Sequence, residues 1–155
     1  MAELNQKLLS HFLNPRNVGV IEHPDGFGQS LNPVNQYMTD IYLRIKDDKI
    51  VECRFKSFGC VVTIAVASAL TVVVKDRPIH SFTAPGSMNL VIDLITKELG
   101  GVPAENWHCP PTATQAFYLA LRDFAARTHQ KELETAIDSI LHDVKCYFDA
   151  RLEKT

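Results

Sequence analysis

One change of periodicity constrains the fold of this chain more than any other feature. Residues 40–46 and 51–56 alternate apolar and polar side chains on either side of a turn at Asp47 and Asp48. A period of two predicts strands with one buried face, and after Gly59 the period becomes helical. The apolar side of the two strands comprises Ile41, Leu43, Ile45, Val51, Cys53 and Phe55. We therefore predict an antiparallel hairpin that runs directly into a helix.

The other predicted elements are mostly helical. Apolar stripes predict helices over residues 4–13, 88–99, 112–127 and 131–152. The glycines and prolines of residues 18–34 predict a loop, with a short strand near residues 18–21. Strands followed by a run of helices favour an α+β fold, with a small antiparallel sheet and helices packed on one face.

Composition excludes several classes of protein. The 155 residues are 46% hydrophobic and 22% charged, which suits one globular domain. The formal net charge is -2 and no basic stripe is present, so we expect neither nucleic acid nor membrane as a partner. The N-terminus is too polar for a signal peptide, and the apolar run over residues 61–74 is too short to span a bilayer. We expect a cytoplasmic protein.

The four cysteines are predicted to be reduced, because the cytosol keeps thiols reduced. Cys60 and Cys109 each stand at the start of a predicted helix, where unpaired N–H groups and the helix dipole favour a thiolate. We expect these two to be more acidic and more exposed than Cys53. Cys53 shares the apolar strand face and is interpreted as a small buried hydrophobe.

A soft metal site is a further hypothesis. His108 precedes Cys109, and thiolates with an imidazole suit zinc or the iron of an iron–sulfur cluster. A structural role for His108 is an open alternative. Spacing alone does not bring Cys60 and Cys109 together. No phosphate-binding glycine motif or HExxH is present, so nothing favours a dinucleotide enzyme or a hydrolase.

Four segments carry a family resemblance: LLSHFLNPRNVGVIEHPDGFG, IYLRIKDDKIVECRFKSFGC, VVTIAVASALTVVVKDRPI and the HC pair at residues 108 and 109. Over about residues 4–127 the chain resembles the iron–sulfur cluster assembly scaffolds IscU, SufU and the N-terminal domain of NifU. The resemblance implies a sheet of about three antiparallel strands with helices on one face. It also implies that three cysteines meet at one exposed end, Cys60 being the second and Cys109 the third.

The implied function is that of a scaffold and not of an enzyme. A cysteine desulfurase would deliver sulfur to Cys60 or Cys109, and these residues with His108 would bind iron or a labile iron–sulfur cluster. The cluster would then pass to acceptor proteins.

The first site cysteine of the family is missing. The family triplet Cys-Gly-Asp falls on Asn35-Gln36-Tyr37. Asn35 offers a weak oxygen ligand and Tyr37 a phenol, and neither equals a thiolate for soft iron. Asp40 cannot replace the lost aspartate, because a slip of one residue would turn the apolar face of the strand outward. Two alternatives stay open: a degenerate paralogue that acts as a binding or regulatory module, and a zinc site. The segment GVPAENW before His108 also replaces Leu-Pro-Pro-Val-Lys, so we do not expect recognition by the family's chaperone.

The C-terminal segment is predicted to be an addition to the family domain. We divide the chain into a scaffold domain over residues 1–130 and a helical extension over residues 131–155. Its apolar stripe consists of Leu133, Ile137, Ile140, Val144 and Tyr147. Such a stripe packs along a partner helix, either on its own domain or in a homo-oligomer. Cys146 lies beside the stripe and is given no role.

Overall fold

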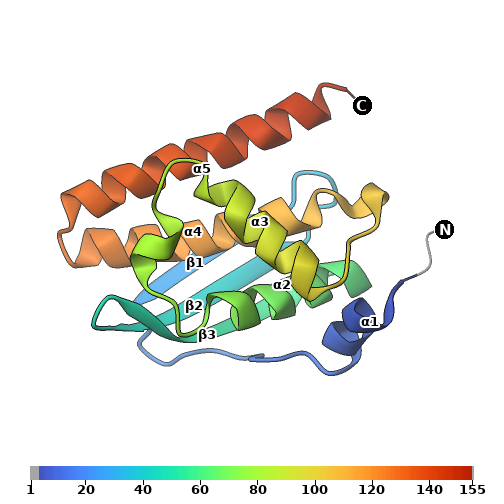
Figure 1. The fold of residues 1–155 in the computed structure, drawn as a ribbon, viewed down its shortest axis with the longest axis horizontal. Helices are drawn as coiled ribbons and strands as arrows, with labels where there is room; N and C mark the ends of the chain where they lie inside the picture. Colours follow the sequence, from blue (N-terminus) through green and yellow to red (C-terminus); the bar gives the residue numbers. More distant parts are fainter. Residues whose placement is uncertain (1–3, 155) are drawn as a thin grey trace.

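The computed structural model describes residues 4–154. Its elements follow the predicted order of one short helix, then strands, then further helices (Figure 1). They are α1 (Gln6–Leu13), β1 (Gly26–Leu31), β2 (Met38–Lys46), β3 (Lys49–Phe58), α2 (Val61–Val74), α3 (Ser87–Glu98), α4 (Cys109–Arg127) and α5 (Lys131–Leu152), with 3-10 turns at Ile79–Phe82 and Ala104–Asn106.

The predicted hairpin is confirmed. The strands form a three-stranded antiparallel sheet in the order β1-β2-β3. Ile41 pairs with Phe55 and Leu43 with Cys53, and these four side chains share the buried face. Val51 is a correction: the register shifts between Arg44 and Ile45, and Ile50 is fully buried where Val51 was predicted to be. Asp47 and Asp48 both adopt a positive φ, of 52° and 58°, which is the geometry of a two-residue turn whose twist suits a hairpin.

Strand β1 corrects the prediction of a loop over residues 18–34. A Cβ on Gly28 would collide with the backbone carbonyl of Ala116, and one on Gly26 with that of Ala120. These two glycines therefore let β1 approach α4 closely, which is a use of glycine that sequence alone does not distinguish from a turn. The short strand expected near residues 18–21 is reduced to one isolated parallel bridge between Val18 and Phe55.

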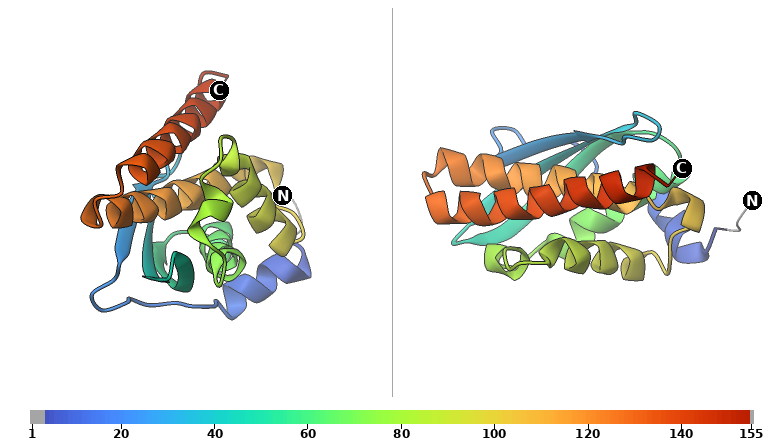
Figure 2. Two further views of the ribbon diagram at one scale, coloured as in Figure 1. Left: turned by 60° about the vertical axis from the view of Figure 1, so that its left-hand side comes forward. Right: turned by 90° about the horizontal axis from the view of Figure 1, so that it is seen from above.

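The helices pack on one face of the sheet, as predicted. In Figure 2 the strands gather on one side of the molecule and the helices on the other. Helix α2 contacts β3, α1, α3 and α4, which explains why its sequence is apolar almost all round. Helix α4 lies along β1 and β2. Its Tyr118 is fully buried and donates a hydrogen bond of 2.8 Å to the carbonyl of Phe82.

Helix α4 begins at Cys109, three residues before the predicted start near Thr112. Pro110 and Pro111 occupy its first turn, where a missing N–H costs nothing because no acceptor is available there. Cys109 is thus the first residue of the helix and does not belong to an extended segment that precedes it.

Helix α5 packs antiparallel on α4 in its own domain (Figure 1). Ile137, Ile140, Val144 and Phe148 are its buried residues, and the predicted Leu133 and Tyr147 are partly buried. On the α4 side, Arg122 forms ion pairs with Glu134 and Asp138 of α5. The apolar stripe of α5 therefore packs on the chain's own domain, which is one of the two predicted alternatives. In residues 4–154, no helix combines the length and the apolar character needed to cross a bilayer.

Candidate functional site

Cys60 and Cys109 are brought together by the starts of two helices. Cys60 is the N-cap residue of α2, and Cys109 is the first residue of α4. The hydroxyl of Thr63 lies 3.4 Å from Sγ of Cys60 and 3.9 Å from Sγ of Cys109. The fold therefore supplies the proximity that the sequence spacing could not.

Thr63 is a site residue that the sequence analysis missed. It is the third residue of α2, so its side chain faces back toward the N-cap position. That offset of three residues is the signal that could have identified it. The crowding here also explains Gly59, because a Cβ on this glycine would lie 2.8 Å from Cβ of Thr63 and 2.9 Å from Cδ2 of Tyr37.

The two thiols differ in acidity. Burial raises the pKa of Cys60, but hydrogen bonds from the Thr63 hydroxyl and from the backbone N–H groups of Thr63 and Val62 outweigh it, so the pKa is lowered. Cys109 is only 2% exposed, and burial raises its pKa to about 11 despite a hydrogen bond with Thr63. Cys60 is thus more acidic and more exposed than Cys53, as expected. Burial raises the pKa of Cys109 less than that of Cys53, which agrees with the expected order, but Cys109 is almost as buried as Cys53, and the thiolate predicted at this helix start is wrong.

His108 lies beside Cys109, with its Nδ1 atom 3.7 Å from the sulfur. The same Nδ1 is 2.7 Å from Nδ2 of Asn32, a residue that is 1% exposed. Because Oδ1 of Asn32 accepts the N–H of Val34, the amide NH₂ of Asn32 faces the imidazole and donates to Nδ1. Burial lowers the pKa of His108, so the neutral ring with its proton on Nε2 is favoured.

These contacts do not assemble a complete metal site. Within residues 4–154, no group of three or more His, Cys, Asp or Glu side chains is arranged to hold a metal ion. Thr63 links the sulfurs of Cys60 and Cys109, and His108 contacts the sulfur of Cys109. Nδ1 of His108, however, is engaged by Asn32. The cluster offers two sulfurs to a soft ion, and the imidazole would have to exchange a hydrogen bond to join them.

Asn35 lies in the loop that joins β1 to β2. Its Oδ1 accepts the N–H of Tyr37 at 3.0 Å, so this oxygen closes the loop locally. Gln36 between them has a φ of 65°, the left-handed conformation that glycine adopts most easily. The middle position of the family triplet is a glycine, and the conformation of Gln36 agrees with the proposed register. Asp40 instead accepts a hydrogen bond from Gln29 at 2.8 Å.

The remaining cysteines lie outside this cluster. Cys53 is fully buried on the apolar strand face, and burial raises its pKa, as its interpretation as a hydrophobe requires. Cys146 is exposed on α5, with its sulfur 3.5 Å from Nε2 of His142.

Exposed apolar side chains occur at the ends of β1 and β3 and in the loop between β1 and β2. Phe58 is 66% exposed, Leu31 54% and Val34 48%, and the ring of Tyr37 is 38% exposed beside Gly59. An exposed apolar patch of this kind is typical of a surface that binds another protein. Its residues follow no period in the sequence that would have predicted a shared surface.

Comparison with known proteins identifies relatives over most of the chain. Residues 3–131 match the family model described as NifU-like N terminal domain. The chain is 39% identical over 132 residues to the iron-sulfur cluster assembly scaffold protein IscU of Aquifex aeolicus (strain VF5), which covers 84% of this chain and 81% of that protein. It is 36% identical over 120 residues to the iron-sulfur cluster assembly scaffold protein IscU 1 of Archaeoglobus fulgidus, covering 77% and 75%.

Solved structures agree in fold. The putative iron-sulfur cluster assembly scaffold protein for the SUF system from Fervidobacterium islandicum AW-1 matches 75% of this chain and 94% of its own, with a TM-score of 0.57 and 12% identity. The N-terminal NifU-like protein of Brucella abortus matches 91% of each chain, with a TM-score of 0.50 and 18% identity. At these identities the likeness concerns the fold alone.

Proposed function

Since the chain belongs to the NifU-like N-terminal domain family, we propose that it is a scaffold on which an iron–sulfur cluster is assembled for transfer to acceptor proteins. The relatives from Aquifex aeolicus and Archaeoglobus fulgidus are called iron-sulfur cluster assembly scaffold proteins. The protein holds the cluster as cargo and catalyses no reaction of its own.

One observation carries this proposal. The sulfurs of Cys60 and Cys109 both lie within reach of the Thr63 hydroxyl, although the residues are 49 positions apart in the sequence. A fold that needed only packing would not place two cysteines at the starts of two helices. Soft thiolates at one point of the surface suit iron and sulfide.

Cys60 is the residue we assign as the sulfur acceptor. It is half-buried and Cys109 is buried, so a donor protein can reach Cys60 first. The Cys60 thiolate attacks the outer sulfur of the persulfide on a cysteine desulfurase. The sulfur–sulfur bond of the donor breaks, a new one forms on Cys60, and the donor cysteine leaves as a thiolate. The exposed apolar side chains of Phe58, Leu31 and Val34 are the surface on which we expect the desulfurase to dock.

The bound cluster should be labile. Asn35 stands where the family has a cysteine, and its oxygen already accepts a hydrogen bond from Tyr37. Two thiolates and a hydrogen-bonded imidazole hold iron less firmly than three thiolates do. Zinc is a second ion that this donor set could take, but it would need one or two further ligands.

A second candidate function rests on the same loop. Because Asn35 and Gln36 close the loop without a thiolate, the chain can also be a paralogue that keeps the fold and the docking surface but assembles no cluster. We further propose that α5, which begins where the family match ends at residue 131, is an addition to the scaffold domain.

Transfer of labelled sulfur tests the proposal. The apo protein is incubated with a cysteine desulfurase and ³⁵S-cysteine, and the label on each cysteine is located by peptide mapping without reductant. We expect label on Cys60, its loss in Cys60→Ser and its retention in the surface control Cys146→Ser. Equal labelling of the Cys60→Ser variant and the unchanged protein would contradict the assignment of Cys60 as acceptor.

A further inference from the structure

A cavity separate from the cysteine cluster lies where α1, α2 and α3 meet. Its volume is about 630 Å³, within the range of small-molecule sites, and none of Cys60, His108 or Cys109 lines it. Its charged and titratable lining consists of Lys7, His11, Arg16, Arg77, Lys97 and Glu98. Four of these residues are cationic and one is anionic, so the cavity is positive in a chain whose net charge is -2.

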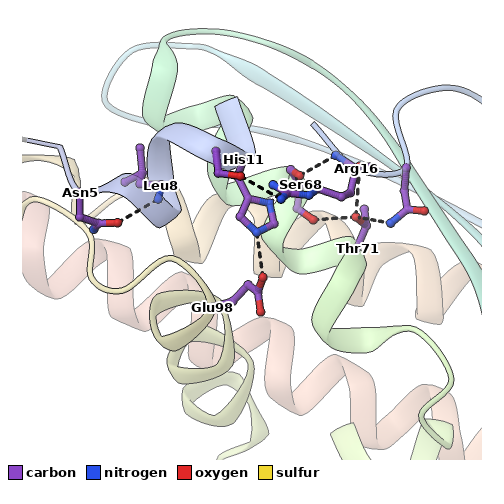
Figure 3. Close-up of polar contacts among 9 residues, drawn as sticks. Asn5, Leu8, His11, Arg16, Ser68, Thr71 and Glu98 are labelled. Carbon is purple, nitrogen blue, oxygen red and sulfur yellow. Dashed lines mark hydrogen bonds and ion pairs between the residues drawn. The ribbon is translucent and has the colours of Figure 1, made fainter. Parts of the chain in front are cut away.

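Arg16 is held at the edge of this cavity by hydrogen bonds. Its backbone N–H donates to Oγ of Ser68 at 2.9 Å (Figure 3). Its Nη2 donates to Oγ of Ser10 at 2.9 Å. Its Nη1 is buried and finds no acceptor among residues 4–154. A buried donor without a partner is costly. The guanidinium of Arg16 nevertheless keeps its positive charge beside the cavity that this residue lines.

The one carboxylate of the lining is already engaged. Nε2 of His11 lies 2.8 Å from Oε2 of Glu98, and Nδ1 lies 2.7 Å from Oγ of Ser68 (Figure 3). Since Oγ of Ser68 accepts the N–H of Arg16, its own proton can point to Nδ1 of His11, so Nε2–H donates to Glu98. Glu98 is therefore turned toward the histidine.

The other cations of the cavity have no such partner. In the described part of the chain, no ion pair is formed by Lys7, Arg77 or Lys97. The wall between them includes Val73 of α2 and Leu94 of α3. The cavity thus combines convergent positive charge with a small apolar surface, which suits an anionic small molecule better than a bare ion.

We propose that this cavity is a binding site for a small molecule that carries several phosphate or carboxylate oxygens. Arg16 supplies a directional donor, since its guanidinium is already fixed by Ser10, and Arg77 and Lys97 supply charge from the rim. The site does not depend on the scaffold role, because it shares no residue with the cysteine cluster.

Calorimetric titration of the full chain at fixed salt tests this proposal, with inorganic pyrophosphate and citrate as separate probes. We expect one saturable site for at least one probe. Binding of pyrophosphate alone would identify a phosphate ligand, and binding of citrate alone would identify a carboxylate ligand. Binding of both would identify a site that selects its ligand by negative charge. Arg77→Gln with Lys97→Gln should raise Kd by about tenfold or more, because charge-assisted hydrogen bonds are among the stronger polar contacts. These two side chains are exposed, so the variant should fold.

The matched control is Lys46→Gln with Lys145→Gln, which removes the same charge from exposed positions outside the cavity. Its Kd should stay within about twofold of the unchanged protein at fixed salt. Arg16→Gln, checked for folding by circular dichroism, should weaken binding as the rim variant does. No saturable binding of either probe, or equal weakening in the rim and control variants, would overturn the proposal.

Discussion

Cys60 and Cys109 share one neighbour, the hydroxyl of Thr63, at 3.4 and 3.9 Å from their sulfurs. A hydroxyl can donate one proton at a time, so it stabilises one thiolate in preference to the other. The lowered pKa of Cys60 and the raised pKa of Cys109 indicate that this thiolate is Cys60. The pair is therefore asymmetric before any iron is bound.

The asymmetry predicts the order of alkylation in the native apo protein. Cys60 should react with iodoacetamide well before Cys109, because a thiol with a pKa of about 11 is a thiolate in roughly one molecule per thousand at pH 8. Cys53, fully buried, should react only after unfolding. Mass spectrometry of timed samples measures the order. Early labelling of Cys109 or Cys53 would show that the helix starts are packed differently.

Thr63→Val should raise the pKa of Cys60. The substitution keeps the shape of the side chain but removes the hydroxyl that hydrogen-bonds to the Cys60 sulfur. The hydroxyl favours the thiolate, so its removal should raise the pKa of Cys60, and the pH midpoint of Cys60 alkylation should move to higher pH. Thr135→Val on the exposed side of α5 is the matched control and should leave the midpoint unchanged. An unmoved midpoint in Thr63→Val would assign the acidity of Cys60 to the backbone N–H groups alone.

Helix α5 should unfold together with the rest of the domain. Phe148 is 6% exposed. The centroid of its ring lies 6.1 Å from the ring centroid of Trp107, the one tryptophan of the chain. Phe148→Ala should lower the free energy of unfolding by about 3 kcal/mol, because it removes a buried aromatic ring. Denaturant unfolding followed by tryptophan fluorescence and by circular dichroism measures it, with Cys146→Ala as the exposed control on the same helix. Two separate transitions would mean that α5 is an independent unit.

Restoring the family triplet should strengthen cluster binding. Asn35→Cys with Tyr37→Asp adds a thiolate at the position where the family resemblance places the first site cysteine. We expect cluster loss to a chelator to become roughly tenfold slower, since even outer-shell changes alter metal affinity by about 10–100-fold. Asn35→Ala with Tyr37→Asp removes the same loop contacts without adding a thiolate and serves as control. If both variants lose the cluster equally fast, residue 35 does not face the site.

The hairpin and most helices could be predicted from the sequence because their side chains repeat with a clear period. The alternation of Ile41 and Leu43 with polar residues depends only on local geometry, and so does the stripe of Ile137, Ile140 and Val144. Strand β1 was missed because Gly26 and Gly28 serve a contact with α4, and a contact between distant segments leaves no local period.

The site could be predicted only in part, because local features can be predicted from the sequence and contacts between distant segments cannot. Cys60 and Cys109 stand at helix starts, which are local features, and the family resemblance supplied their proximity. Burial depends on what packs over a residue, so the loss of exposure and of acidity at Cys109 was not predictable from its position at a helix start. Thr63 and Asn32 were overlooked because a hydroxyl and an amide are common on surfaces and gain meaning only from their neighbours.

Anaerobic reconstitution of the purified apo protein is the most direct test of the scaffold function. The protein is incubated with ferrous iron, sulfide and a thiol reductant, desalted, and analysed for iron, acid-labile sulfide and visible absorption. We predict a cluster that is bound below full occupancy, that is lost in Cys60→Ser and in Cys109→Ser, and that persists in Cys146→Ser, with folding of each variant checked by circular dichroism. Iron and sulfide retained by folded Cys60→Ser and Cys109→Ser variants, or a cluster absent from all four proteins, would contradict the scaffold function.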